Sequence, residues 1–181
     1  MDNLERLFRE YHDPLVRYLA RRVGDRDLAE ELAQETFVRA MRHGPVARER
    51  AWLFAVATNL VRDEVRRDAR ERRRLSLLKG EADVAGPQEP DVYTAERAAD
   101  ALREQALARR AVDALAERDR MALLMREEGL DYHEIAAVLG LSVGSVGTTL
   151  SRARRRLIEV YETLQRDRSG TRAAMEGSDV A

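Results

Sequence analysis

Small polar side chains followed by a run of arginines occupy residues 142–156, and these are the residues whose types and spacing most suggest a chemical role. Apolar residues recur there at spacings of four, three and four, at Val146, Leu150, Ala153 and Leu157, so they should face the core of a helix. Polar residues on the opposite face of such a helix can enter the major groove of a DNA duplex, where arginines contact phosphates. The residues predicted to contact duplex DNA are Ser145, Thr148, Thr149, Ser151, Arg152 and Arg155.

The preceding segment supplies the first half of a helix-turn-helix. Ile135, Ala136 and Leu139 would form the inner face of the first helix, Gly140 can adopt the backbone conformation of a tight turn, and Ser142 can cap the next helix. An αα-hairpin with solvated arginines is the alternative that a charge run alone would favour. We favour DNA binding because the small residue, the glycine and the serine fall at the offsets that the turn requires.

Composition excludes several other kinds of chemistry. The 181-residue chain has no cysteine, so disulfides, thiolate metal sites and cysteine nucleophiles are excluded. Its three histidines have no mutual ligand spacing, and no nucleophile–base pair or glycine-rich phosphate loop occurs at a spacing that catalysis requires. We therefore expect no enzyme activity, no metal and no cofactor.

Basic and acidic residues are unevenly distributed along the chain, although the net charge is close to zero. The chain has 32 basic and 33 acidic residues and a net charge of −1, which taken alone argues against a nucleic-acid ligand. Residues 62–74, however, hold seven arginines against four acidic residues, a local net charge of +3. The longest apolar run, residues 51–57, is far shorter than the roughly 20 residues that cross a bilayer. We therefore expect a cytoplasmic protein without membrane insertion.

Helical apolar patterning runs through most of the chain and predicts an all-α fold of two small helical domains joined by a flexible acidic linker. The expected parts are domains at 1–78 and 97–165, a linker at 79–96 and a disordered tail at 166–181. From Gly80 to Glu96 the linker has five acidic residues and no Lys or Arg. Pro14 suggests a kink or a helix boundary near Asp13. Positions expected to face inward include Phe8, Leu19, Phe37, Val65, Leu102 and Leu107.

Two separate stretches carry a resemblance to a known family. The C-terminal stretch, residues 130–154, contains the helix-turn-helix, and the N-terminal stretch comprises residues 27–40 and 52–67. In order and spacing they resemble regions 4 and 2 of the extracytoplasmic-function, or group 4, sigma factors of the sigma-70 family. The resemblance implies a factor that binds core RNA polymerase and directs promoter-specific transcription initiation.

The resemblance also implies roles for particular residues. Glu31, Gln34 and Glu35 would bind the clamp helices of the polymerase β′ subunit, and Glu30, Glu31 and Glu35 have no evident counter-charge in the local sequence. The loop 43–49 and the following helix would engage the melted minus-ten strand, and the C-terminal domain would bind the minus-thirty-five element. The residues on the melted strand would be Asn59, Arg62, Asp63, Arg66 and Arg67. Further implied partners are the β flap and an anti-sigma factor.

Some alternatives stay open at the level of the sequence. Trp52 could stack on a displaced base, although a lone tryptophan on an apolar helical face more often belongs to the core. Family members commonly carry basic residues at the positions of Gly147 and Thr149, so the minus-thirty-five contacts should be weaker in charge or differently specified. A helix-turn-helix regulator acting without core polymerase is the alternative function, and the N-terminal stretch favours the sigma factor over it.

Overall fold

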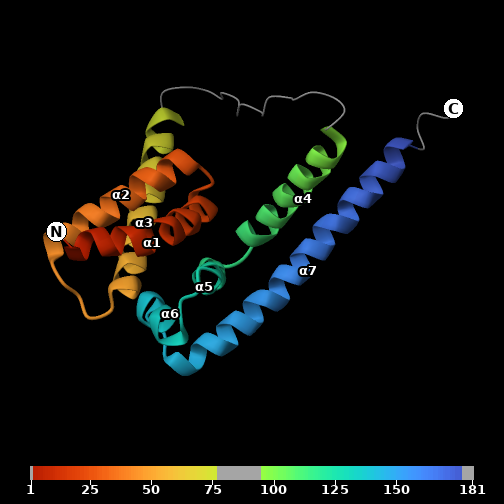
Figure 1. The fold of residues 1–181 in the computed structure, drawn as a ribbon. Helices are drawn as coiled ribbons and strands as arrows, with labels where there is room; N and C mark the ends of the chain where they lie inside the picture. Colours follow the sequence, from red (N-terminus) through yellow and green to blue (C-terminus); the bar gives the residue numbers. More distant parts are fainter. Residues whose placement is uncertain (1, 77–94, 177–181) are drawn as a thin grey trace. The chain divides into compact units, whose positions relative to one another are not determined.

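The computed structural model describes the backbone of residues 2–76 and 95–176, and the side chains of residues 3–70 and 102–168. All regular structure in these ranges is helical (Figure 1), which confirms the expected all-α fold class. The helices are α1 (Asp2–Val23), α2 (Arg26–His43), α3 (Glu49–Ser76), α4 (Ala95–Asp113), α5 (Glu117–Glu127), α6 (Tyr132–Leu139) and α7 (Val143–Glu176).

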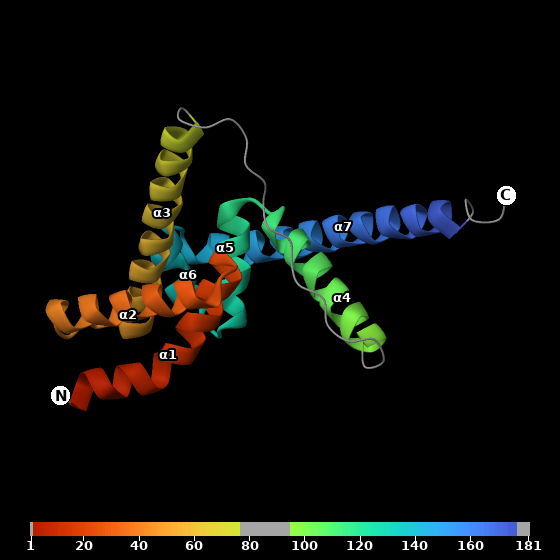
Figure 2. The same cartoon turned by 90° about the horizontal axis from the view of Figure 1, so that it is seen from above.

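Helices α1, α2 and α3 pack against one another, and α3 crosses the α1–α2 pair (Figures 1 and 2). Leu15, Tyr18 and Phe54 are fully buried between them, with the Tyr18 and Phe54 ring centroids 5.1 Å apart. The Tyr18 hydroxyl forms a 2.8 Å hydrogen bond with the hydroxyl of Thr58, which itself donates to the carbonyl of Phe54. Because both of these buried hydroxyl groups have a hydrogen-bond partner, the pair orients α1 on α3 at little cost in desolvation.

Local sequence signals set the two ends of α2. Asp25 has an extended backbone, and its carboxylate accepts hydrogen bonds from the backbone N–H groups of Asp27 and Leu28 at 2.9 and 3.2 Å. These bonds satisfy donors that the first turn of a helix leaves unpaired. At the other end Gly44 has a φ of 82°, a left-handed value that glycine adopts without strain. The positions of the ends of α2 therefore follow from two short local motifs.

The contacts divide the chain into two compact units, Met1–Pro87 with Leu124–Val146, and Gln88–Leu123 with Gly147–Ala181. Of the described helices, the first unit contains α1 to α3, the end of α5, α6 and the first residues of α7. The second contains α4, the start of α5 and the rest of α7. The units group the helices differently from the domains expected at 1–78 and 97–165, and those boundaries stay a prediction.

Within the first unit, the segment that joins α5 to α6 is held by arginines of α1 and α3. The side chain of Glu128 is only 2% exposed and pairs with Arg17 at 2.9 Å and Arg21 at 3.3 Å. The Arg50 guanidinium donates to the carbonyl oxygen of Glu128, and α3 packs against α6. Glu128 lies 78 to 111 residues from these arginines in the sequence, so no local pattern could have revealed the cluster.

The second unit has buried apolar residues on α4, on the start of α5 and on α7, and in the turn between α4 and α5. Tyr161 of α7 donates a hydrogen bond of 3.2 Å to Glu104 of α4 at the solvent-exposed surface. The buried apolar residues are Leu107, Ala111, Leu115, Met121, Ala122, Leu150 and Ala153.

Several sequence-based expectations need correction. Of the kink or helix boundary expected near Asp13, the boundary is wrong, because Pro14 lies inside α1, and the kink stays a prediction. Phe8, Val65 and Leu102 are 45%, 60% and 59% exposed rather than inward, since a helix presents only one stripe to its core.

Of the two segments expected to lack regular structure, the tail is helical over its described residues and the linker is almost wholly undescribed. The structure places Arg166 to Glu176 in α7, where the tail was expected to be disordered, because extending an existing helix is far easier than starting one. The expected linker at 79–96 lies outside the described residues, apart from its last two residues, with which α4 begins.

Candidate nucleic-acid interface

The turn between α6 and α7 is built from short-range hydrogen bonds. Asp131 caps α6 by accepting the backbone N–H of Glu134 at 2.8 Å, and the Glu134 carboxylate accepts the backbone N–H of Asp131 at 2.8 Å. The bond from the Glu134 N–H lowers the pKa of Asp131 below its usual value. This reciprocal capping box was missed at the sequence level, although its Asp-x-x-Glu spacing was there to be found.

Gly140 ends α6 in the left-handed conformation, with φ 64° and ψ 39°, as the sequence predicted for the turn. The N–H of Leu141 then donates to the carbonyl of Ala136 at 2.9 Å, and the hydroxyl groups of Ser142 and Ser145 lie 2.6 Å apart at the start of α7. The chain thus changes direction within three residues, which fixes where α7 begins.

On α7, most of the predicted duplex-contact residues have exposed side chains, and one does not. Ser145, Thr148, Ser151 and Arg155 are exposed. Thr149 is 5% exposed, so the expectation that its side chain contacts DNA is wrong for this structure. The sequence held the signal, because Thr149 lies three residues after Val146 and four before Ala153, both fully buried on the inner face.

Arg152 is also engaged within the protein. Its Nε donates to Asp119 Oδ2 at 3.0 Å and its Nη2 donates to Asp119 Oδ1, so both carboxylate oxygens are used. The hydrogen bonds to Asp119 raise the pKa of Arg152 above its ordinary value. Sequence reasoning missed this pair because the two residues are 33 positions apart.

The predicted minus-ten residues lie on one stripe of α3. Asn59, Asp63, Arg66 and Arg67 are exposed, and Arg62 is half-buried. Two arginines pair with acidic residues one turn earlier in the helix, Arg66 with Asp63 at 3.7 Å and Arg67 with Glu64 at 2.5 Å. Such exposed pairs contribute little to stability, so phosphates can replace the carboxylates as partners.

Trp52 lies at the start of α3 and is only partly buried. Its ring centroid is 5.0 Å from that of His43, and it borders a narrow hollow with Gly44, Pro45 and Val46 of the loop before α3. The ring is thus shared between the protein core and the loop, and both sequence-based readings of Trp52 stay open.

The predicted polymerase-binding residues lie along α2. Glu31 and Gln34 are exposed, and Glu35 is half-buried and pairs with Arg39 at 2.8 Å. Glu30 lies 3.3 Å from His12 Nε2 and 3.9 Å from Arg26. The expectation that Glu30 and Glu35 have no local counter-charge is therefore wrong.

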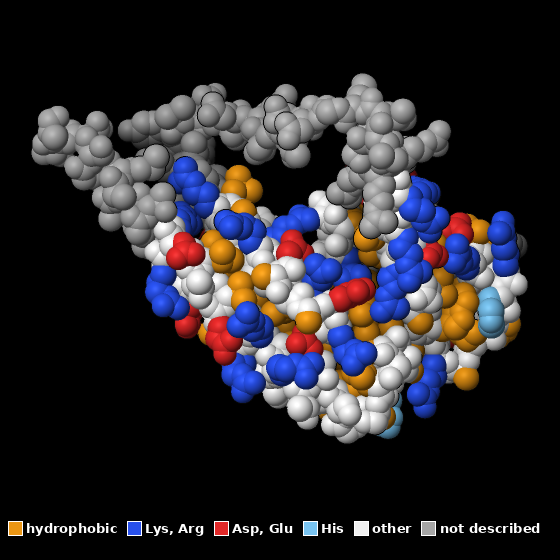
Figure 3. All heavy atoms as spheres, turned by 180° about the vertical axis from the view of Figure 1, so that it is seen from behind, with side chains coloured by type: hydrophobic (Ala, Val, Ile, Leu, Met, Phe, Trp, Pro, Cys, Tyr) orange, Lys and Arg blue, Asp and Glu red, His pale blue; other side chains and the backbone are white. Residues whose placement is uncertain are grey.

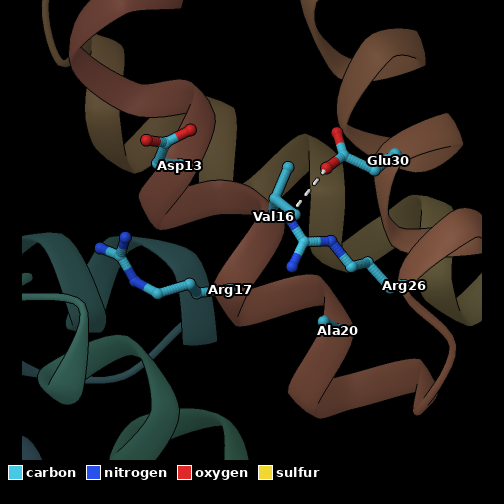
Figure 4. A pocket seen from close by; sticks show the side chains of 6 residues that line it. All are labelled: Asp13, Val16, Arg17, Ala20, Arg26 and Glu30. Atoms are coloured by element: carbon cyan, nitrogen blue, oxygen red, sulfur yellow. Dashed lines mark ion pairs between the residues drawn. The ribbon is translucent and has the colours of Figure 1, made fainter.

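A hollow of about 270 Å³ lies beside α2, between the start of α2 and α1. Figure 4 shows that it is lined by Asp13, Val16, Arg17 and Ala20 of α1 and by Arg26 and Glu30 of α2, with the Arg26–Glu30 ion pair inside it. Two basic and two acidic side chains balance in charge there, so the hollow has no electrostatic preference for an anion or a cation.

Charge is also mixed over the face of the molecule drawn in Figure 3. Figure 3 shows arginine side chains interspersed with acidic ones over one face, rather than gathered into one basic field. No single helix among the described residues is long and apolar enough to cross a membrane, although α6 with the first part of α7 meets the length and composition criteria as one bent pair. In the same residues, no group of three or more His, Cys, Asp or Glu side chains is arranged to hold a metal ion.

Comparison with known proteins places these helices in a family. Sigma-70 region 2 matches residues 7–71, and Sigma-70, region 4 matches residues 105–157. RNA polymerase sigma factor YlaC of Bacillus subtilis is 31% identical over 165 residues, which cover 86% of this chain and 90% of YlaC. ECF RNA polymerase sigma factor SigL of Mycobacterium tuberculosis is 37% identical over 160 residues, which cover 83% of this chain and 84% of SigL.

Two solved structures have a fold similar to that of this chain. The sigma factor RpoE from Bartonella quintana, solved with the anti-sigma factor NepR, superposes with a TM-score of 0.64 at 21% identity, covering 90% of this chain and 98% of RpoE. CnrH, solved with the cytosolic domain of CnrY, gives a TM-score of 0.59 at 25% identity, covering 88% of each chain. The chain belongs to the extracytoplasmic-function sigma factors of the sigma-70 family. It is a transcription initiation factor that binds core RNA polymerase and directs promoter-specific transcription.

Proposed function

We propose that three exposed helical faces divide the work of initiation: α2 binds the polymerase, α3 holds the melted minus-ten strand and α7 reads the minus-thirty-five duplex. The observation that supports this most is that each face lies inside a segment matching sigma-70 region 2 or region 4. The chain itself performs no catalysis, since the polymerase supplies the chemistry. It acts in the cytoplasm, where core RNA polymerase is found.

The polymerase contact is proposed at Glu31, Gln34 and Glu35 on α2, facing the basic β′ clamp helices. Glu31 and Gln34 are exposed, so the double variant Glu31→Ala with Gln34→Ala should weaken binding to core polymerase without unfolding α2. The matched control is Glu10→Ala, an exposed acidic residue on α1. Equal core affinity in the two variants, with equal helicity, would remove α2 from this interface.

The contact with the melted strand is proposed at Asn59, Arg62, Asp63, Arg66 and Arg67, with Trp52 and the loop before α3 next to the displaced bases. Arginines that follow a single strand act after the duplex has opened. Arg66→Ala with Arg67→Ala should therefore reduce open-complex formation, measured by permanganate reactivity of unpaired thymines, while upstream duplex protection persists. Loss of both signals together would argue against a separate role for α3.

The test of the whole assignment is transcription in vitro with purified core enzyme across a library of randomised promoters. The sigma-factor function predicts initiation at a shared pair of sequence elements only when this chain and core polymerase are both present. Sequence-specific DNA binding by the chain alone, with no effect on initiation by core enzyme, would instead support the helix-turn-helix regulator.

An anti-sigma partner and the β flap complete the proposed interactions. Support for the first comes from the RpoE structure, which was solved in complex with the anti-sigma factor NepR. CnrH was likewise solved in complex with the cytosolic domain of CnrY. A protein that acts as the anti-sigma factor should form a stable complex with this chain and inhibit transcription in the library assay. A complex that leaves transcription unchanged would refute the inhibitory role.

A further inference from the structure

The most constrained charged pair on α7 joins it to α5 within the second unit. The Asp119 side chain is 9% exposed, and the Arg152 guanidinium uses two N–H groups on its two oxygens. A planar guanidinium on a carboxylate fixes orientation as well as distance, because both bonds must be aligned at once. The pair therefore sets the rotation of α7 about its axis relative to α5.

The three arginines that follow Ala153 on α7 differ from Arg152 in their ion pairing. Arg154 and Arg155 are exposed and have no ion pair among the described residues, whereas Arg156 lies 3.3 Å from Glu159. Arg155 follows Thr148 by seven residues and Ser151 by four, so all three lie on one face of the helix. Arg155 is thus the unengaged arginine that shares a face with the exposed polar residues near the start of α7.

The Asp119–Arg152 ion pair is not explained as part of a binding site for a small ligand. A hollow of about 450 Å³ beside it is lined by Asp119, Arg152, Arg155 and Glu159, among others. An anion in this hollow would meet the carboxylates of Asp119 and Glu159, and a cation would meet three arginines, Arg152, Arg155 and Arg156. The geometry suits an internal clamp better than a binding site.

We infer that Arg152 is a positioning residue, which orients α7 through Asp119, and that Arg155 makes the phosphate contact on this face. The inference rests on the proposed reading of the minus-thirty-five duplex by α7 and assigns different tasks to two arginines one turn apart. Arg152 acts through Asp119, and its charge is already paired with that carboxylate. Arg155 has its charge available for DNA.

The deciding measurement is the salt dependence of holoenzyme binding to a promoter fragment selected by the wild-type holoenzyme from a randomised library. Each phosphate contact contributes about 0.9 to the slope of log affinity against log salt. The double variant Asp119→Asn with Arg152→Gln keeps the net charge of the protein and keeps hydrogen-bonding groups at both positions. It should retain the wild-type slope, because no phosphate contact is lost. The matched variant Arg155→Gln should lose about one unit of slope.

Single variants test the positioning role. Measured well below the melting temperature of the variant, Arg152→Ala should weaken binding and broaden the base preference at the upstream element, with no loss of slope. The double variant, which leaves no unpaired carboxylate, should recover part of both properties. A merely structural arginine would lower the melting temperature without changing base preference. A slope that falls by about one unit in the double variant would overturn the inference. An unchanged slope in Arg155→Gln would overturn the assignment of the phosphate contact.

Failure of the proposed function gives a different result. Thr148→Asp places a negative charge on the exposed face of α7 and should abolish upstream protection if this helix lies on the duplex. Unchanged protection in Thr148→Asp would refute the duplex-reading role of α7 itself. If Thr148→Asp abolishes protection while the double variant loses slope, only the assignment of Arg152 fails.

Discussion

The turn at Gly140 provides a sharp test of how the helix-turn-helix is built. Gly140 has a φ of 64°, and a Cβ added to it would have no heavy atom within 4 Å. The cost of Gly140→Ala is therefore confined to the backbone, where a left-handed conformation costs a residue with a Cβ about 1 kcal/mol or slightly more. We expect Gly140→Ala to lower the free energy of unfolding by about 1 kcal/mol.

Two other glycines serve as matched controls. Gly144 lies in the first turn of α7 without a positive φ and also has open space around it, so Gly144→Ala should stabilise the protein by about 0.5 kcal/mol. Gly129 has a φ of 82°, and its added Cβ would lie 3.0 Å from Arg50 Nη2. Gly129→Ala should therefore cost more than Gly140→Ala, because Arg50 must also move.

Urea unfolding followed by circular dichroism measures all three variants. The expected order of stability is Gly144→Ala, wild type, Gly140→Ala and Gly129→Ala, with unchanged dependence on urea concentration. A Gly140→Ala variant as stable as wild type, or one shifted in the same direction as Gly144→Ala, would refute the left-handed turn between α6 and α7.

Three further predictions follow from buried groups and from the cap of α6. Leu150 is fully buried and Ile158 is 58% exposed, so Leu150→Ala should cost about 2–5 kcal/mol and Ile158→Ala within about 0.5, by the same unfolding assay. Tyr18→Phe removes the hydroxyl bonded to Thr58 and should cost about 1 kcal/mol, and a neutral effect would mean that this bond does not contribute. The N–H of Glu134 lowers the pKa of Asp131 in the folded protein. The ionised Asp131 carboxylate therefore stabilises the fold at pH values above its pKa in the unfolded chain, which is about 4, and this stabilisation is lost as the pH falls through the lower pKa of the folded protein. The stability difference between wild type and Asp131→Asn should therefore shrink below about pH 4, and a difference that is constant with pH would contradict the cap.

The local sequence pattern is enough to predict the structure where a single short motif determines it. The capping residue of α2, the glycine of the α6–α7 turn and the inward positions Val146, Leu150 and Ala153 all follow from residues within a few positions of one another. The burial of Thr149 was equally local, since the same spacing rule that placed Val146 and Ala153 inward applies to it.

The limits of local pattern are visible at Phe8 and Leu102, which have helical spacing and yet are exposed. Helical periodicity identifies which residues share a stripe, but the width of the stripe that becomes buried depends on how closely another helix approaches. The sequence alone therefore overestimated the buried face of α1 and α4.

The sequence by itself determined the helical class, the family and the position of the helix-turn-helix, because periodicity, turn residues and two ordered motifs are properties of neighbouring residues. The tertiary structure alone decided which charged side chains are available. Arg152 is bound to Asp119, and Glu128 is buried against Arg17 and Arg21, in pairs separated by 33 to 111 residues. The residue type gives the charge of a side chain, but its ion-pair partner depends on which helices the fold brings together.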